Sequence, residues 1–183
     1  SIRLHAEQKG RQVLMHKESV FRFLRGFFTQ PGLSEHFQSL ETNVLAYHHF
    51  HYACREFSVG LVEEAKQDME KAVTIDPEWL NFKTGEASKA IIGEICSYRH
   101  ELEPVNAVQL LFENIPLSAI RLCKLKRKVL ASVTASEFFT AYKKAEYGKV
   151  RNLMVITFLY NPHLFLNRGV WSIVFQTLLM RQV

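Results

Sequence analysis

Apolar residues recur every three or four positions along most of the chain, which is the spacing of one face of an α-helix. No stretch alternates apolar and polar residues as a half-buried strand does. The first helix is predicted over 12–29, with Val20 and Leu24 on its buried side. Pro31 and Gly32 end it, because proline lacks a backbone donor and glycine tolerates a left-handed turn.

A second helix is predicted over 34–58, with Ser34 as its N-cap. Its buried face is expected to be formed by residues spaced by three and four, namely Phe37, Leu40, Val44, Tyr47, His51 and Cys54.

A third helix is predicted after Gly60, and Asp76 and Pro77 end it. Ala65, Met69 and Ala72 recur along one face, and the acidic residues are expected outside. Small side chains let a neighbouring helix approach closely, which is what a helical hairpin repeat requires.

The rest of the chain also has helical spacing. Five more helices are predicted, over 85–100, 104–114, 117–132, 134–147 and 169–182. The fourth of these is expected to begin with the capping box Thr134-Ala135-Ser136-Glu137. The prediction is a single all-α domain over 1–183, a stack of about eight or nine helices.

The segment after Gly60 resembles the second helix of a tetratricopeptide repeat, since Gly60, Ala65, Ala72 and Pro77 fall on its consensus positions. The preceding helix fits poorly, because His49 stands where that consensus has tryptophan. The usual period of about 34 residues is absent. A degenerate copy lies about 85 residues later. It matches at Gly148, Met154, Pro162 and Phe165 if three residues are deleted.

Composition fits a folded domain, with 48% hydrophobic and 22% charged residues. The three cysteines, Cys54, Cys96 and Cys123, are far apart and odd in number, which favours a reduced, cytoplasmic chain. The N-terminus lacks the apolar core of a signal peptide, and polar residues interrupt 153–180, so no membrane span is expected.

The stretch AYHHFHYAC, residues 46–54, places three histidines and a cysteine within nine positions. His48, His51 and Cys54 spread over about 120° of a helix, so they cannot easily close on one ion. A packed aromatic helix is the preferred interpretation, and a metal site and a pH-sensitive polar contact are the alternatives. No metal ligand, cofactor site or catalytic residue is assigned.

The most basic stretch, RLCKLKRK, carries Arg121, Lys124, Lys126, Arg127 and Lys128. Three interpretations remain open: a solvated face, attraction to an anionic membrane or phosphate-bearing lipid, and docking of an acidic protein surface. Nucleic acid is not expected, because no recognition motif accompanies the charges.

Three segments in this order, FRFLRGFFTQPGLSEHFQSL, YACREFSVGLVEEAKQDMEKAVTIDPEWL and NPHLFLNRGVWSIVFQTLL, resemble the helical C-terminal region of bacterial family 2 glycosyltransferases. The resemblance covers nearly the whole chain, and its motifs are moderately specific. IRLH, residues 2–5, is similar to the arginine-x-histidine end of that family's catalytic domain, so the resemblance implies that residues 1–10 close a missing N-terminal domain. His5 would then approach the metal–nucleotide site.

The chain has no Asp-x-Asp, since Asp68 and Asp76 are its only aspartates, and it has no glycine-rich phosphate loop. It is therefore not expected to be catalytic alone. The resemblance implies a non-catalytic domain, peripheral at the inner membrane face, that positions the enzyme, its acceptor or a partner. Two alternatives are a free-standing tetratricopeptide-like adaptor that binds a peptide, and a helical enzyme of unrecognised type.

Overall fold

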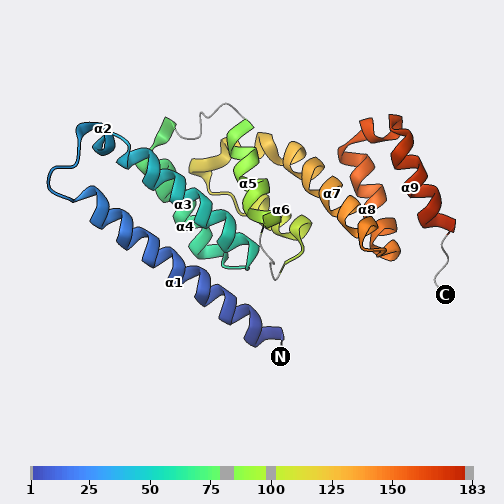
Figure 1. Ribbon diagram of the computed structural model, residues 1–183, viewed down its shortest axis with the longest axis horizontal. Coiled ribbons are helices and arrows are strands. Elements are labelled where there is room, and N and C mark those ends of the chain that lie inside the picture. Colours follow the sequence, from blue (N-terminus) through green and yellow to red (C-terminus); the bar gives the residue numbers. More distant parts are fainter. Residues whose placement is uncertain (1, 79–84, 98–101, 180–183) are drawn as a thin grey trace. The chain divides into compact units, whose positions relative to one another are not determined.

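The computed structural model describes residues 2–78, 85–97 and 102–179, and it describes the side chains of residues 8–78, 86–96 and 102–179. Within these ranges the secondary structure is helical and contains no strand, which confirms the all-α prediction (Figure 1). The helices are α1 (Ile2–Phe28), α2 (Glu35–Gln38), α3 (Glu41–Ser58), α4 (Val62–Ile75), α5 (Gly85–Ser97), α6 (Pro104–Glu113), the 3-10 helix η2 (Leu117–Leu125), α7 (Lys126–Lys143), α8 (Tyr147–Tyr160), the 3-10 helix η3 (Pro162–Leu166) and α9 (Arg168–Leu179).

The chain was expected to be one domain, and its contacts group into two compact units, Ser1–Leu125 and Lys126–Val183. In the first unit, α3 is the central helix, because α1, α4, α5 and α6 all pack against it. Its core side chains are fully buried: Ala46, Phe50, Ala53, Cys54 and Phe57. In the second unit, α7 pairs with α8, and α9 and η3 pack against α8.

The α3–α4 hairpin turns at Gly60, whose φ is +83°. The Gly60 amide donates to the Phe57 carbonyl at 3.2 Å, and the Leu61 amide donates to the Glu56 carbonyl at 2.8 Å. This pair of bonds is the Schellman motif, in which a left-handed residue satisfies the last carbonyls of a helix. Glycine suits the position because it has no Cβ to oppose a positive φ.

The second hairpin repeats the first with a constant offset in residue number. Each end of α7 and α8 lies 85 residues after the matching end of α3 and α4. The turn is repeated too, since Ala145 has φ +57°, its amide donates to Tyr142, and the Glu146 amide donates to Ala141. Ala145 therefore takes the place of Gly60. The predicted copy is present, but its alignment of Gly148 with Gly60 through a three-residue deletion is wrong.

The predicted helix over 34–58 is two helices, α2 and α3, separated at Ser39 and Leu40. Side chains satisfy the backbone there, because the Ser39 hydroxyl donates to the His36 carbonyl at 2.7 Å and the Gln38 amide donates to the Leu33 carbonyl at 3.1 Å. Ser34 precedes α2 but makes no side-chain capping bond.

The predicted buried face of 34–58 is partly wrong. Phe37, Leu40 and Tyr47 are 40–47% exposed, whereas Cys54 is buried. The prediction assumed one continuous helix over 34–58. The break between α2 and α3 changes the side of the helix on which the following residues lie. The four neighbours of α3 also bury positions on several of its sides.

Thr134 does not begin a helix, so the predicted capping box is wrong. It lies within α7, where its hydroxyl donates to the Leu130 carbonyl at 2.7 Å. A threonine bonded in this way can stay inside a helix. The predicted helices over 117–132 and 134–147 are instead η2 followed by the single helix α7.

Candidate functional site

The three histidines of 46–54 turn to different partners. Nδ1 of His49 donates to Asp68 on α4 at 3.2 Å, and Nδ1 of His51 donates to Glu94 on α5 at 2.7 Å. His48 is half-buried and lines a cleft beside α1. No three His, Cys, Asp or Glu side chains among the described residues are arranged to hold a metal ion.

Cys54 is buried on α3, and burial raises the pKa of its thiol far above the ordinary value. A thiol of this kind stays protonated and is a poor nucleophile.

A buried charge cluster, Lys17, His49, Glu56 and Asp68, joins α1, α3 and α4. Nζ of Lys17 lies 2.6 Å from Oε1 of Glu56 and 2.6 Å from Oδ2 of Asp68. The Glu56 and Asp68 side chains are 0% and 1% exposed, so the lysine is the cation that α1 supplies to two buried carboxyl groups. Lys71, which is largely exposed, approaches Asp68 only to 3.7 Å.

Proton affinities in the buried charge cluster differ between its two acids. Burial, with the nearby charge of Asp68, raises the pKa of Glu56 to about 7. Burial also tends to raise the pKa of Asp68, but hydrogen bonds from His49 and Lys17 outweigh it and hold that pKa below its ordinary value. Hydrogen bonds to both acids raise the pKa of Lys17 despite its burial. Of the two acids, Glu56 is therefore the one that titrates near neutral pH.

A second polar group centres on Glu94 of α5. It accepts from His51 and from Nε of Arg55, and these bonds lower its pKa in spite of burial. The Arg55 guanidinium also lies over the Tyr52 ring, 5.4 Å from its centroid, and the Tyr52 hydroxyl bonds Nδ1 of His16 at 2.7 Å. Burial, with the charges of His51 and Arg55, lowers the pKa of His48.

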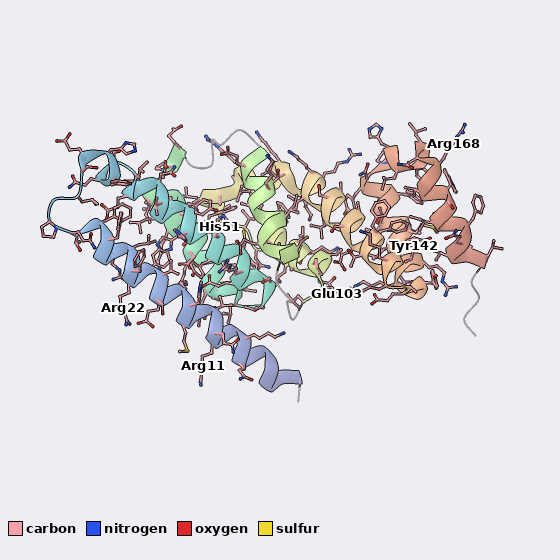
Figure 2. All side chains as sticks on the ribbon, viewed as in Figure 1. Arg11, Arg22, His51, Glu103, Tyr142 and Arg168 are labelled. Carbon is pink, nitrogen blue, oxygen red and sulfur yellow. The ribbon has the colours of Figure 1, made fainter. Side chains whose placement is uncertain are left out.

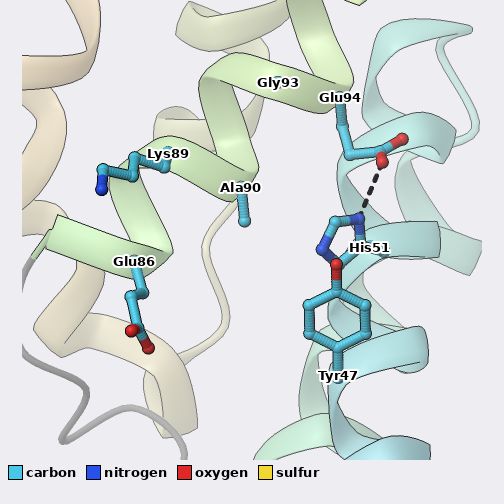
Figure 3. A pocket seen from close by; sticks show the side chains of 7 residues that line it. All are labelled: Tyr47, His51, Glu86, Lys89, Ala90, Gly93 and Glu94. Atoms are coloured by element: carbon cyan, nitrogen blue, oxygen red, sulfur yellow. Dashed lines mark hydrogen bonds and ion pairs between the residues drawn. The ribbon is translucent and has the colours of Figure 1, made fainter.

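Two clefts open beside these groups on α3. One, of about 200 Å³, lies between α1 and α3, and the other, of about 380 Å³, lies between α3 and α5 (Figure 3). His51, Tyr47 and Glu94 line both clefts. The centroids of the Tyr47 and His51 rings are 4.0 Å apart. On the α5 side, the lining of the larger cleft includes the small residues Ala90 and Gly93.

The clefts contain a histidine that a carboxylate holds in one orientation. Because Nδ1 of His51 donates to Glu94, Nε2 is left as the acceptor when the ring is neutral. Nε2 is buried and bonds no described protein atom. An acceptor nitrogen of this kind, beside the Tyr47 ring and Arg55, can bind a polar group that enters the clefts.

The predicted repeat-packing residues lie in the first hairpin or directly after it. Gly60 forms its turn, Ala65, Met69 and Ala72 are at most 1% exposed, and Pro77 follows α4. The prediction that acidic residues lie outside α4 is wrong for Asp68, which is buried and contacts Lys17 and His49 in the interior.

The basic stretch does not lie on one α-helix. Arg121 and Lys124 belong to η2, where three residues make a turn, and Lys126, Arg127 and Lys128 form the first turn of α7. The three- and four-residue spacing of Arg121, Lys124 and Lys128 would align them on one continuous α-helix, but the change from η2 to α7 between Leu125 and Lys126 breaks that alignment.

The first turn of α7 contains no acidic residue. Cations at a helix N-terminus oppose the helix dipole at a cost of about 0.3–1 kcal/mol each. Helix stability therefore gives no reason for this placement. A surface role for the basic stretch stays a prediction.

His5 lies in α1, but its side chain is outside the described residues, so its predicted approach to a catalytic site stays a prediction. No described helix combines the length and the apolar character needed to cross a membrane.

Sequence reasoning missed the buried charge cluster. Its partners are 39 residues apart between Lys17 and Glu56, and local spacing does not report such a contact. One signal in the sequence could have indicated that these acids are buried. Glu56 and Asp68 each directly precede a core residue, Phe57 and Met69 respectively.

Comparison of the chain with protein-family models finds no match, and neither curated proteins nor solved structures give a significant one. The likeness to the helical region of family 2 glycosyltransferases therefore stays a prediction from sequence motifs.

Proposed function

We propose that this chain is the non-catalytic C-terminal helical region of a family 2 glycosyltransferase, which positions the enzyme, its acceptor or a partner protein in the cytoplasm. The α3–α4 hairpin is the observation that carries the proposal. Its turn at Gly60, its small buried residues Ala65 and Ala72 and its end before Pro77 agree with the tetratricopeptide-like hairpin that the resemblance implies.

Local chemistry supports a role in positioning rather than in catalysis. The clefts on α3 present Tyr47, His51 and Arg55, which can stack on a bound group and hydrogen-bond it. The chain has no Asp-x-Asp to hold the metal that a nucleotide-sugar transferase uses on the diphosphate. A catalytic domain from the same polypeptide is its proposed first partner.

The gene sequence upstream of this segment is the first test. We expect an in-frame nucleotide-binding domain that contains Asp-x-Asp, whereas a stop codon directly before this segment would remove the proposal. The peptide-binding adaptor would then be the remaining candidate, with the clefts on α3 as its binding surface.

Truncation tests the positioning role. A full-length enzyme cut before this segment should still hydrolyse its donor nucleotide sugar but should lose transfer to the acceptor. Tyr47→Ser in the full-length enzyme should raise the KM for the acceptor and leave the KM for the donor unchanged. Equal transfer with and without the helical region would contradict positioning.

A further inference from the structure

The two units carry opposite charge. Residues 126–183 contain nine Lys and Arg residues against two acids, Glu137 and Glu146, which gives a formal net charge of +7. Residues 1–125 contain fourteen basic and sixteen acidic residues, a net charge of −2. The positive charge of the chain is thus concentrated in the second unit.

The second unit also exposes apolar side chains that the fold does not cover. Its aromatic ladder, Phe158, Phe165, Trp171 and Phe175, links α8, η3 and α9 with ring centroids 4.1, 5.9 and 5.8 Å apart. Phe158 is buried, but Phe165, Trp171 and Phe175 are 45%, 37% and 59% exposed.

Helix α9 has two apolar faces. Val170, Val174 and Thr177 face the interior of the unit. Trp171, Phe175 and Leu178, spaced by four and three, form an outer face, and Leu178 is 52% exposed. The Trp171 indole is held in place because its Nε1 donates to the Phe165 carbonyl at 2.8 Å.

Cations bracket this outer face. Arg168 is the exposed first residue of α9, at the end of the helix labelled in Figure 2. Toward the other end, the Tyr142 hydroxyl donates to Gln176, and the exposed Lys143 and Lys144 directly follow Tyr142 in the chain. Apolar side chains flanked by Lys and Arg are typical of surfaces that lie in a membrane interface.

We propose that the aromatic ladder and the outer face of α9 dock on an anionic lipid bilayer, with Trp171 and Phe175 entering the headgroup boundary. An anionic bilayer offers negative charge to the cations of this surface and an apolar layer to its exposed aromatic side chains. The same unit of a second copy is a poor partner for this surface, because two units of +7 repel each other. The inference rests on charge and exposure alone, so it and the glycosyltransferase proposal can fail separately.

Tryptophan fluorescence of the whole chain tests the docking. The chain has two tryptophans, and Trp79→Phe leaves Trp171 as the reporter. With vesicles of equal parts phosphatidylglycerol and phosphatidylcholine at low salt, we expect a blue shift of its emission. Pure phosphatidylcholine should give none, and high salt should reverse the shift, because screening shortens the range of the attraction.

Matched variants separate the two contributions. Lys143→Gln with Lys144→Gln should lower the partition coefficient roughly thirtyfold at low salt, since each cation is worth about fivefold near an anionic surface. Phe175→Ser should lower it at least about tenfold. Arg11→Gln with Arg22→Gln, both labelled on α1 in Figure 2, and Phe23→Ser change exposed positions on α1 and should leave the partition coefficient unaltered.

Several results would overturn the proposal. If the emission does not shift at low salt, the surface does not bind a bilayer, and a protein with an acidic rim would be the remaining candidate to bind it. Equal binding to both kinds of vesicle would refute the role of charge. A shift that follows chain concentration without lipid would indicate self-association. Controls on α1 that weaken binding as much as the second-unit variants would refute the location. Circular dichroism of each variant shows whether it is folded.

Discussion

Replacing Lys17 by methionine should destabilise the first unit strongly and in a pH-dependent way. The substitution keeps the length of the side chain but removes the cation that lies 2.6 Å from both Glu56 and Asp68. Both acids are at most 1% exposed, so water cannot replace the lost partner. Removing one partner of a buried ion pair typically costs about 3–5 kcal/mol, and we expect a loss in this range at pH 8.

The loss should shrink at low pH, because the carboxyl groups can take up protons. The pKa of Glu56 is raised from 4.5 to about 7, so between these values the folded state holds a proton that the unfolded state has released. Stability from this group is complete below pH 4.5 and is lost as pH rises through about 7. A raised pKa of this size corresponds to about 3 kcal/mol. At pH 5 the Lys17→Met variant therefore leaves fewer uncompensated charges than at pH 8.

Urea unfolding followed by circular dichroism at pH 5 and pH 8 measures the effect, and hydrogen exchange of the α1 amides locates it. Lys71→Met is the matched control, since Lys71 is 56% exposed and lies 3.7 Å from Asp68, and it should cost less than about 1 kcal/mol. Glu56→Gln should flatten the fall in stability between pH 5 and pH 8, and combined with Lys17→Met it should recover about 2 kcal/mol at pH 8. If Lys17→Met costs no more than Lys71→Met at pH 8, the cluster does not hold α1 and the reasoning is wrong.

Three further predictions concern the hairpins and the histidine segment. Gly60→Ala should cost about 1–2 kcal/mol in chemical unfolding, whereas Ala145→Gly should gain up to about 1 kcal/mol, because both turns need a positive φ; equal signs would contradict the shared turn. Ala65→Leu and Ala72→Leu should each cost about 1–3 kcal/mol, since neither fully buried site has room, and parent-like melting would refute the tight contact. Stoichiometric zinc should leave the melting temperature unchanged, because the histidines of 46–54 face different partners; a reproducible rise of several degrees would revive the metal site.

Local chemistry made part of the fold predictable. The all-α class followed from the spacing of apolar residues, and the ends of α4 and the start of α6 followed from Gly60, Asp76-Pro77 and Pro104. These signals act within a few residues of the boundary they set. Thr134 misled because threonine can cap a helix or bond within one, and only its neighbours in space decide between the two.

The candidate site was less accessible to sequence reasoning. His49 and His51 were correctly interpreted as belonging to a helix, but their acid partners lie on α4 and α5, 19 and 43 residues away. Asp68 was placed outside because a charge on an amphipathic helix usually faces water. Its burial depends on Lys17, which a separate helix brings into contact.

The 85-residue correspondence between the hairpins shows that one backbone frame accepts two kinds of interior. Where the first hairpin buries Glu56 and Asp68, the second buries Ala141 and Leu153 at the matching positions. The first interior is specific for a helix that brings a lysine, whereas the second makes no such demand. In protein design the two hairpins could therefore be exchanged as segments of equal length. The first hairpin would still require a helix such as α1 that supplies a lysine to its buried acids.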